Sequence, residues 1–224
     1  MKKLVVTASL AVVGFAISAF VVPKTTPAND NFEGVVSYSI SVDNPQMAAF
    51  IGTSMKVYIK GSKTKTLQDG MVSKTIFADH STTDAPTILL DAMGNKYQVK
   101  NDPNKKEEKD PAIKYMDSTK TILGYTCHKA EVTATDAQGQ TATSEVYYTE
   151  DIVTPPAKSG PFKSLKGFPL EYSMSQQGVK VSITATKVDK QSLTDDTFTI
   201  PSGYKLMTMD EIRTDIQKNA SSGQ

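Results

Sequence analysis

Apolar and polar residues alternate with a period of two along most of the chain, a pattern typical of strands that bury one face. In the clearest run Val36, Tyr38, Ile40 and Val42 alternate with serines. Similar runs follow at short spacing, and turn dipeptides such as Asp69-Gly70 separate them. We expect further strands at residues 55–60, 63–68, 71–78, 87–91, 95–99, 120–123, 125–135, 142–149, 168–175, 179–187 and 197–200.

A short helix is predicted after the first strand. Asn44-Pro45 supplies an N-cap followed by a proline at the first helical position, and an apolar stretch with almost no polar face comes next. A helix this apolar must cover another part of the molecule. The residues alone favour a plug over one end of the β core. The alternative is a lid over a hydrophobic cavity, in which Met47, Phe50 and Ile51 contact a ligand.

A second helix is predicted near the end of the chain. Thr208 and Glu211 have the spacing of a capping box, in which each side chain bonds the other residue's backbone N–H. Met209, Ile212 and Ile216 form a narrow apolar stripe along this helix. We assign residues 206–224 to the helix and its polar tail.

The connections between the predicted strands indicate the fold class. Most strands are separated only by a turn, and there is no strand–helix–strand rhythm of the kind that builds a doubly wound sheet. Residues 101–111 are charged, and residues 151–169 are rich in proline, so both read as irregular segments. We therefore expect a mainly β fold, in which a curved antiparallel sheet forms a half-open barrel with two short helices.

The N-terminus resembles a secretory signal. Lys2 and Lys3 precede an apolar stretch over residues 4–22, and Ile17-Ser18-Ala19 is an acceptable cleavage site. Cleavage predicts a mature chain that begins between about residues 20 and 29. The stretch is also long enough to span a bilayer, so an uncleaved anchor is the alternative. The predicted organisation is a signal or anchor over residues 1–28, one β domain over residues 29–205, and the C-terminal helix and tail.

The amino-acid composition limits the functions and sites that the chain can have. Lys plus Arg total 25 and Asp plus Glu total 24, so no net charge favours nucleic acid, and no basic run interleaved with aromatic residues is present. Cys127 is the single cysteine and cannot form an internal disulfide. It adjoins His128 in a predicted strand, where neighbouring side chains point to opposite faces, so we expect no thiol–imidazole pair. We expect Cys127 to be buried and inert, and we find no metal-site, cofactor or catalytic motif.

Several segments together resemble a family of uncharacterised bacterial envelope proteins with a C-terminal "iP.gY" strand, which is related to GLPGLI-family proteins. The resemblance rests on Phe32-Glu33-Gly34, residues 122–130 (ILGYTCHKA), residues 146–152 (VYYTEDI), Gly160-Pro161, residues 166–171 (KGFPLE) and residues 200–204 (IPSGY). These proteins are similar to LolA/LolB-like lipoprotein carriers. The resemblance implies a half-barrel with a lipid-sized groove, and it implies no catalytic residues.

The expected function is therefore that of a periplasmic or extracellular envelope protein. It would hold a lipid or other hydrophobic ligand in the half-barrel groove, with no catalysis and no cofactor. The alternative is a structural or protein-interaction module of the envelope with a filled core, and an enzyme is the third possibility. An envelope protein partner fits either of the first two functions.

Overall fold

The computed structural model describes residues 31–101, 109–135, 139, 141–157, 160–176 and 179–222. The predicted signal or anchor lies outside these residues. The described elements are β1 (Gly34–Val42), α1 (Pro45–Ile51), β2 (Ser54–Lys60), β3 (Lys63–Asp69), β4 (Val72–Asp79), β5 (Thr87–Ala92), β6 (Asn95–Val99), β7 (Ala112–Ile122), β8 (Tyr125–Thr135), β9 (Thr141–Thr149), β10 (Phe168–Gln176), β11 (Val179–Lys190), the 3₁₀ helix η1 (Asp195–Phe198), β12 (Lys205–Met207) and α2 (Met209–Ser222).

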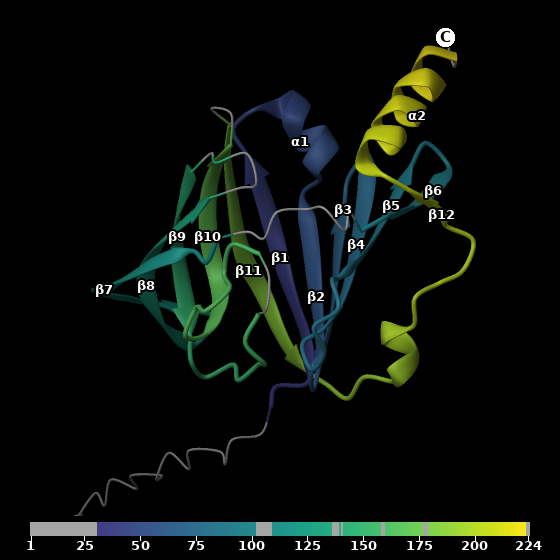
Figure 1. The fold of residues 1–224 in the computed structure, drawn as a ribbon. Coiled ribbons are helices and arrows are strands. Elements are labelled where there is room, and N and C mark those ends of the chain that lie inside the picture. The colour runs from purple at the N-terminus through teal and green to yellow at the C-terminus, as the bar shows by residue number, and fades with distance from the viewer. Residues whose placement is uncertain are drawn as a thin grey trace, which may run out of the picture.

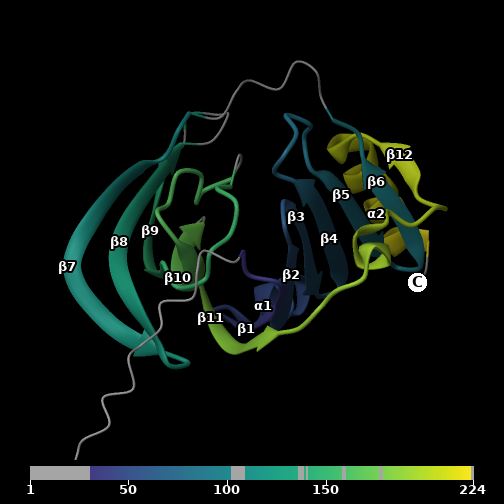
Figure 2. The same cartoon turned by 90° about the horizontal axis from the view of Figure 1, so that it is seen from below.

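The strands form one open curved sheet, which confirms the predicted fold class. Among the described residues the sheet has 12 strands in the order β12-β6-β5-β4-β3-β2-β1-β11-β10-β9-β8-β7. Each of its two halves, β1 to β6 and β7 to β11, is a meander of neighbouring antiparallel strands, and the pairing of β1 with β11 joins them. The sheet curls so that its halves face each other, and α1 lies at one end of the strands (Figures 1 and 2).

The register of the strands shows which side chains share the concave face. Directly paired residues lie on the same face of a sheet. One such row runs through Ala130, Val146, Tyr172, Ile183 and Ile40. Figure 2 shows the segment between β9 and β10 inside the curve of the sheet, and Leu165 and Phe162 of this segment pack against that row's β8–β9 end. The apolar positions of this row therefore line the inside of the curve.

Three apolar clusters lie in different parts of the sheet and differ in which segments cover them. The central cluster includes Val36, Tyr38, Ile183 and the fully buried Ile152 from the β9–β10 segment. A second cluster joins β8 and β9 to Leu165. The third cluster packs Leu90, Ala92 and Tyr97 of β5 and β6 against Ile212 of α2. The chain's own segments thus fill the β7–β11 half, and α2 covers the far edge of the other half.

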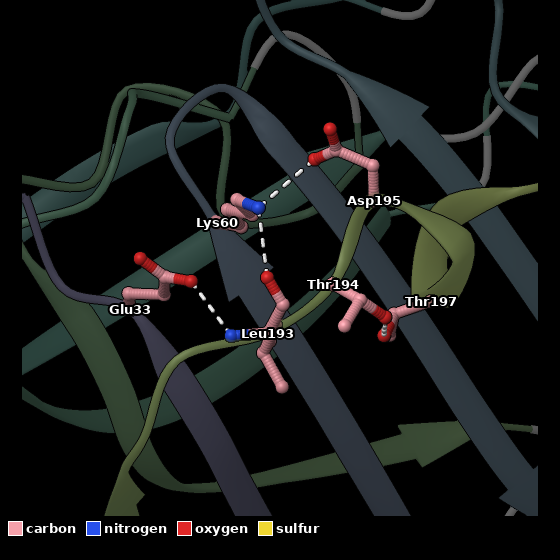
Figure 3. Close-up of polar contacts among 6 residues, drawn as sticks. All are labelled: Glu33, Lys60, Leu193, Thr194, Asp195 and Thr197. Atoms are coloured by element: carbon pink, nitrogen blue, oxygen red, sulfur yellow. Dashed lines mark hydrogen bonds and ion pairs between the residues drawn. The ribbon is translucent and has the colours of Figure 1, made fainter.

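A polar anchor fixes the segment that follows β11 to the base of the sheet (Figure 3). The Lys60 ammonium donates to the Leu193 carbonyl oxygen at 2.7 Å and pairs with the Asp195 carboxylate at 2.9 Å. The Leu193 backbone N–H donates to the Glu33 carboxylate at 2.7 Å. These contacts place η1 beside β3 and lead the chain toward β12 and α2.

The capping box of the second helix is confirmed. The Thr208 backbone N–H donates to the Glu211 carboxylate at 2.8 Å, and the Glu211 N–H donates to the Thr208 hydroxyl at 3.3 Å. Ile212 and Ile216 pack against the third cluster, as the apolar stripe predicts. Met209 does not belong to that packed stripe, because it is exposed at the first position of the helix.

Other boundaries differ from the sequence predictions. Residues 197–200 are not a strand, because η1 and the irregular residues after it occupy that range. The last strand is instead β12, which pairs in parallel with β6. β7 begins at Ala112, well before the expected residue 120, and most of its side chains are exposed. Tyr204 of the "iP.gY" segment lies just before β12 rather than in a strand. Its hydroxyl donates to the Asp91 carboxylate at 2.9 Å.

Candidate functional site

The helix α1 forms as its sequence predicts. The Asn44 side-chain oxygen accepts hydrogen bonds from the backbone N–H groups of Gln46 and Met47, at 3.0 Å and 3.1 Å. Pro45 occupies the first turn, where no N–H is needed. Gly52 ends the helix with a φ of 81°, a conformation that glycine adopts without steric cost.

Two glycines hold α1 tightly against the β3–β4 turn. A Cβ atom on Gly52 would lie 1.3 Å from the Asp69 carbonyl oxygen, and one on Gly70 would lie 2.5 Å from the Phe50 carbonyl oxygen. The Met71 N–H donates to the Ala49 carbonyl oxygen at 3.0 Å. The backbone of α1 is therefore fixed to the sheet, and any lid movement in this region belongs to its side chains.

The structure places the three predicted lid residues on one short helix but in different surroundings. Ile51 packs against the central cluster. Phe50 is 53% exposed and Met47 is 40% exposed. The helix has no fully buried residue, so neither Met47 nor Phe50 is packed into the core as a plug would be.

Met47 and Phe50 belong to a larger group of exposed apolar side chains, which we call the apolar edge. Met71 in the β3–β4 turn and Met93 in the β5–β6 turn are also more than half exposed. Val72 and Ala92, which adjoin these turns, are paired, so both turns lie at the same end of the sheet as α1. The hairpin signals in the sequence place both turns, but they do not reveal that α1 returns to the same end.

Next to α1, the concave face carries a band of half-buried residues that we call the open strip. It consists of the directly paired residues of β3 and β4, namely Thr64, Thr66, Gln68, Lys74, Ile76 and Ala78. On one side the strip adjoins the central cluster through Val57, and on the other side it adjoins the third cluster through Ile88. At one end, the Gln68 amide donates to the Ile51 carbonyl oxygen of α1 at 2.8 Å.

Lys74 is the charged member of the open strip. Its neighbours across the sheet are Gln68 and Leu90. Burial lowers the pKa of the Lys74 ammonium from its ordinary value, because it removes water from the charged form. Sequence reasoning missed this residue, because a lysine in an alternating strand reads as part of the solvent-exposed face.

Cys127 and His128 lie on opposite faces of β8. Cys127 is fully buried, whereas His128 is exposed and lies against the Tyr148 ring. Burial raises the pKa of the Cys127 thiol, which disfavours the reactive thiolate. The two side chains therefore do not form a nucleophile–base pair.

We expect Cys127→Ala to lower the free energy of unfolding by only about 1 kcal/mol, the centre of the range for single substitutions. A thiol reagent should label native wild-type protein slowly and urea-unfolded protein quickly. Rapid labelling of the native protein, or a Cys127-linked dimer isolated from the native host, would contradict an inert thiol.

The carboxylates that line the cleft outside α1 and the open strip are paired with lysines. A cleft of about 180 Å³ is lined in part by Glu145 and Glu171, but Lys129 and Lys120 form ion pairs with these carboxylates at 2.7 Å and 2.5 Å. A shallow groove of about 480 Å³ runs along α2. Across the described ranges, no group of three or more His, Cys, Asp and Glu side chains is placed to hold a metal ion.

In the part of the chain that the structure describes, no helix is both long and apolar enough to cross a bilayer.

Comparisons with known proteins support the fold alone. No family model matches the chain, and no curated protein matches it. Two crystal forms of PNGF-II match with TM-scores of 0.52 and 0.53 at 17% identity, over 84% of this chain. The chain spans about a third of the length of PNGF-II, 34% and 33% in the two forms.

More distant likenesses include a lipoprotein and a LolA superfamily protein. The lipoprotein LppX from Mycobacterium tuberculosis matches with a TM-score of 0.37 at 9% identity, over 73% of this chain and 90% of its own. A LolA superfamily protein from Nitrosomonas europaea matches with a TM-score of 0.37 at 10% identity, over 77% of this chain and 91% of its own. These scores are too low to carry an argument, and the likeness to GLPGLI-family proteins stays a prediction.

Proposed function

We propose that this protein is exported to the cell envelope and binds a lipid or another hydrophobic ligand on the concave face of its curved sheet. It binds the ligand without catalysis and without a cofactor. The ligand lies along the open strip, and Met47 and Phe50 of α1 cover it from one end while Ile51 secures the helix to the core. The signal-like N-terminus supports export, because it has the basic start, apolar stretch and small residues of a secretory signal.

The observation that carries this proposal is the exposed apolar edge beside the open strip. Exposed apolar side chains that gather in one region mark binding sites more often than singly scattered ones do. Met47, Phe50, Met71 and Met93 are all exposed at one end of the sheet. Methionine adapts its shape to varied apolar partners, and each buried CH₂ group of a ligand contributes about 0.8 kcal/mol.

A second candidate is a structural or protein-interaction module of the envelope. It is favoured by the filled β7–β11 half, where Ile152, Phe162 and Leu165 occupy the inside of the curve. In that case the apolar edge would contact an envelope protein rather than a lipid. Native mass spectrometry of protein purified from its own host separates the two candidates, because a co-purifying lipid supports the first and a bare mass supports the second.

We expect Phe50→Ala to weaken the binding of a hydrophobic fluorescent probe by about tenfold and to lower the free energy of unfolding by less than about 1 kcal/mol. The reason is that Phe50 is 53% exposed, so its truncation leaves no core cavity. Probe titration and urea unfolding measure the two effects.

Leu123→Ala is the matched control, because Leu123 is 45% exposed in the β7–β8 turn at the opposite end of the sheet. It should change neither probe affinity nor stability appreciably. A loss of about 3–5 kcal/mol in Phe50→Ala, together with no probe binding by the wild type, would identify α1 as a plug.

A further inference from the structure

Among the residues that the structure describes, Lys74 differs from the other half-buried lysines in lacking a partner. The ammonium groups of Lys60, Lys120 and Lys129 each pair with a carboxylate. Lys65 lies over the Tyr58 and Phe77 rings instead. Within the described ranges, no carboxylate, hydrogen-bond acceptor or aromatic ring contacts the Lys74 ammonium. Burial alone shifts its pKa.

The position of Lys74 relates this unpaired charge to the open strip. The row Tyr38, Met55, Gln68, Lys74 and Leu90 runs directly across the sheet, so all five side chains share the concave face. Gln68, paired with Lys74, donates to the last carbonyl group of α1. Lys74 therefore lies at the α1 end of the strip, close to the apolar edge.

The rest of the strip suits an acyl chain. From Lys74 the strip continues along β4 through Ile76 to Ala78, with Thr66 and Thr64 of β3 beside them. At a rise of about 3.3 Å per residue this path is about 13 Å long. It carries no charge between Lys74 and the far end, where the Thr64 hydroxyl lies 3.2 Å from His80 Nε2.

We infer that Lys74 binds the anionic head group of an amphiphile, a carboxylate or phosphate on an acyl chain, whose chain lies along the open strip. This inference rests on the proposed function and specifies the class of its ligand. An anion beside Lys74 would complete the pairing that a desolvated ammonium requires. Charge complementarity at one end and contact with uncharged side chains along the strip, Ile76 and Ala78 among them, select an amphiphile over a neutral lipid.

Calorimetric titration of the mature protein with laurate, dodecyl phosphate and dodecanol tests this inference. We expect Lys74→Met to weaken laurate binding by about tenfold and to leave dodecanol binding unchanged. Lys74→Arg, which keeps the charge, should retain laurate binding within about threefold. Lys56→Met is the matched control, because Lys56 is exposed on β2, the strand that borders the open strip, and pairs across the sheet with Leu67, on the face opposite to Gln68. It should bind all three ligands as the wild type does.

The outcomes separate this inference from the proposed function. Equal laurate affinity in the wild type and in Lys74→Met overturns the anchoring role but leaves hydrophobic ligand binding intact. If the wild type binds none of the three ligands, both the proposed function and this inference fail. Tight binding of acetate or inorganic phosphate would show that the acyl chain is not needed, and would overturn the inference that the ligand is an amphiphile. If Lys74→Met loses affinity for only one of the two anionic amphiphiles, the result supports head-group binding by Lys74 and identifies that head group.

Discussion

Replacing Ile152 with alanine should lower the free energy of unfolding by about 2–5 kcal/mol, the usual cost of truncating a fully buried isoleucine. Ile152 is 1% exposed and belongs to the central cluster, although it comes from the irregular segment between β9 and β10. The backbone next to it is fixed, because the Phe32 N–H donates to the Val153 carbonyl oxygen at 2.8 Å. The neighbouring chain therefore has little freedom to collapse into the space.

Ile76→Ala is the control for this experiment, because it makes the same chemical change on the open strip. Ile76 is half-buried, so its truncation should lower the free energy of unfolding by only about 1 kcal/mol. Urea unfolding of both variants measures whether the two halves of the sheet are filled unequally. Similar losses from the two substitutions would show that the strip is packed as tightly as the core, and would remove the space assigned to a ligand.

Gly52→Ala should be at least as damaging, with an expected loss of about 4 kcal/mol or more. A Cβ atom at this position would overlap the Asp69 carbonyl oxygen, and the φ of 81° is unfavourable for alanine. Relief of the overlap requires α1 to move away from the β3–β4 turn. Thermal unfolding should therefore show a sharply lower midpoint.

Gly94→Ala separates the overlap from the backbone conformation. Gly94 has a similar φ of 78°, but no described atom lies within 4 Å of a Cβ built on it. Its substitution should cost only about 1–2 kcal/mol. If both variants lost the same stability, the close approach of α1 to the turn would make no contribution of its own.

The sequence predicted those strands that bury one face and expose the other. β8 begins and ends as predicted, and β1 shows the expected alternation, because apolar packing on one side imposes a period of two. Most of β7 was missed, because it is an edge strand exposed over most of its length and its residues carry no such pattern. β12 was missed because it is three residues long and depends on pairing with the distant β6.

The candidate site was only partly accessible from the sequence. Asn44 correctly marked the start of α1, whereas the hypothesis that this apolar helix covers a ligand stays a prediction. The burial of Lys74 depends on which residues of β3 and β5 pair with it, and a single sequence does not specify that pairing. Likewise, the different surroundings of Ile51 and Phe50 depend on how closely Gly52 and Gly70 allow the helix to approach the sheet.

The pairing of β1 with β11 has a consequence for how fast the chain folds. The Thr186 hydroxyl of β11 donates to the Ser37 carbonyl oxygen of β1, although the two residues are 149 positions apart. The β1–β6 meander can form from local contacts, but the sheet centre is completed only when nearly the whole chain is present. Proteins dominated by such distant contacts fold in about milliseconds to seconds. During that interval the apolar face of β1 lacks one neighbour, so a chain emerging N-terminus first exposes Val36 and Ile40 until β11 arrives.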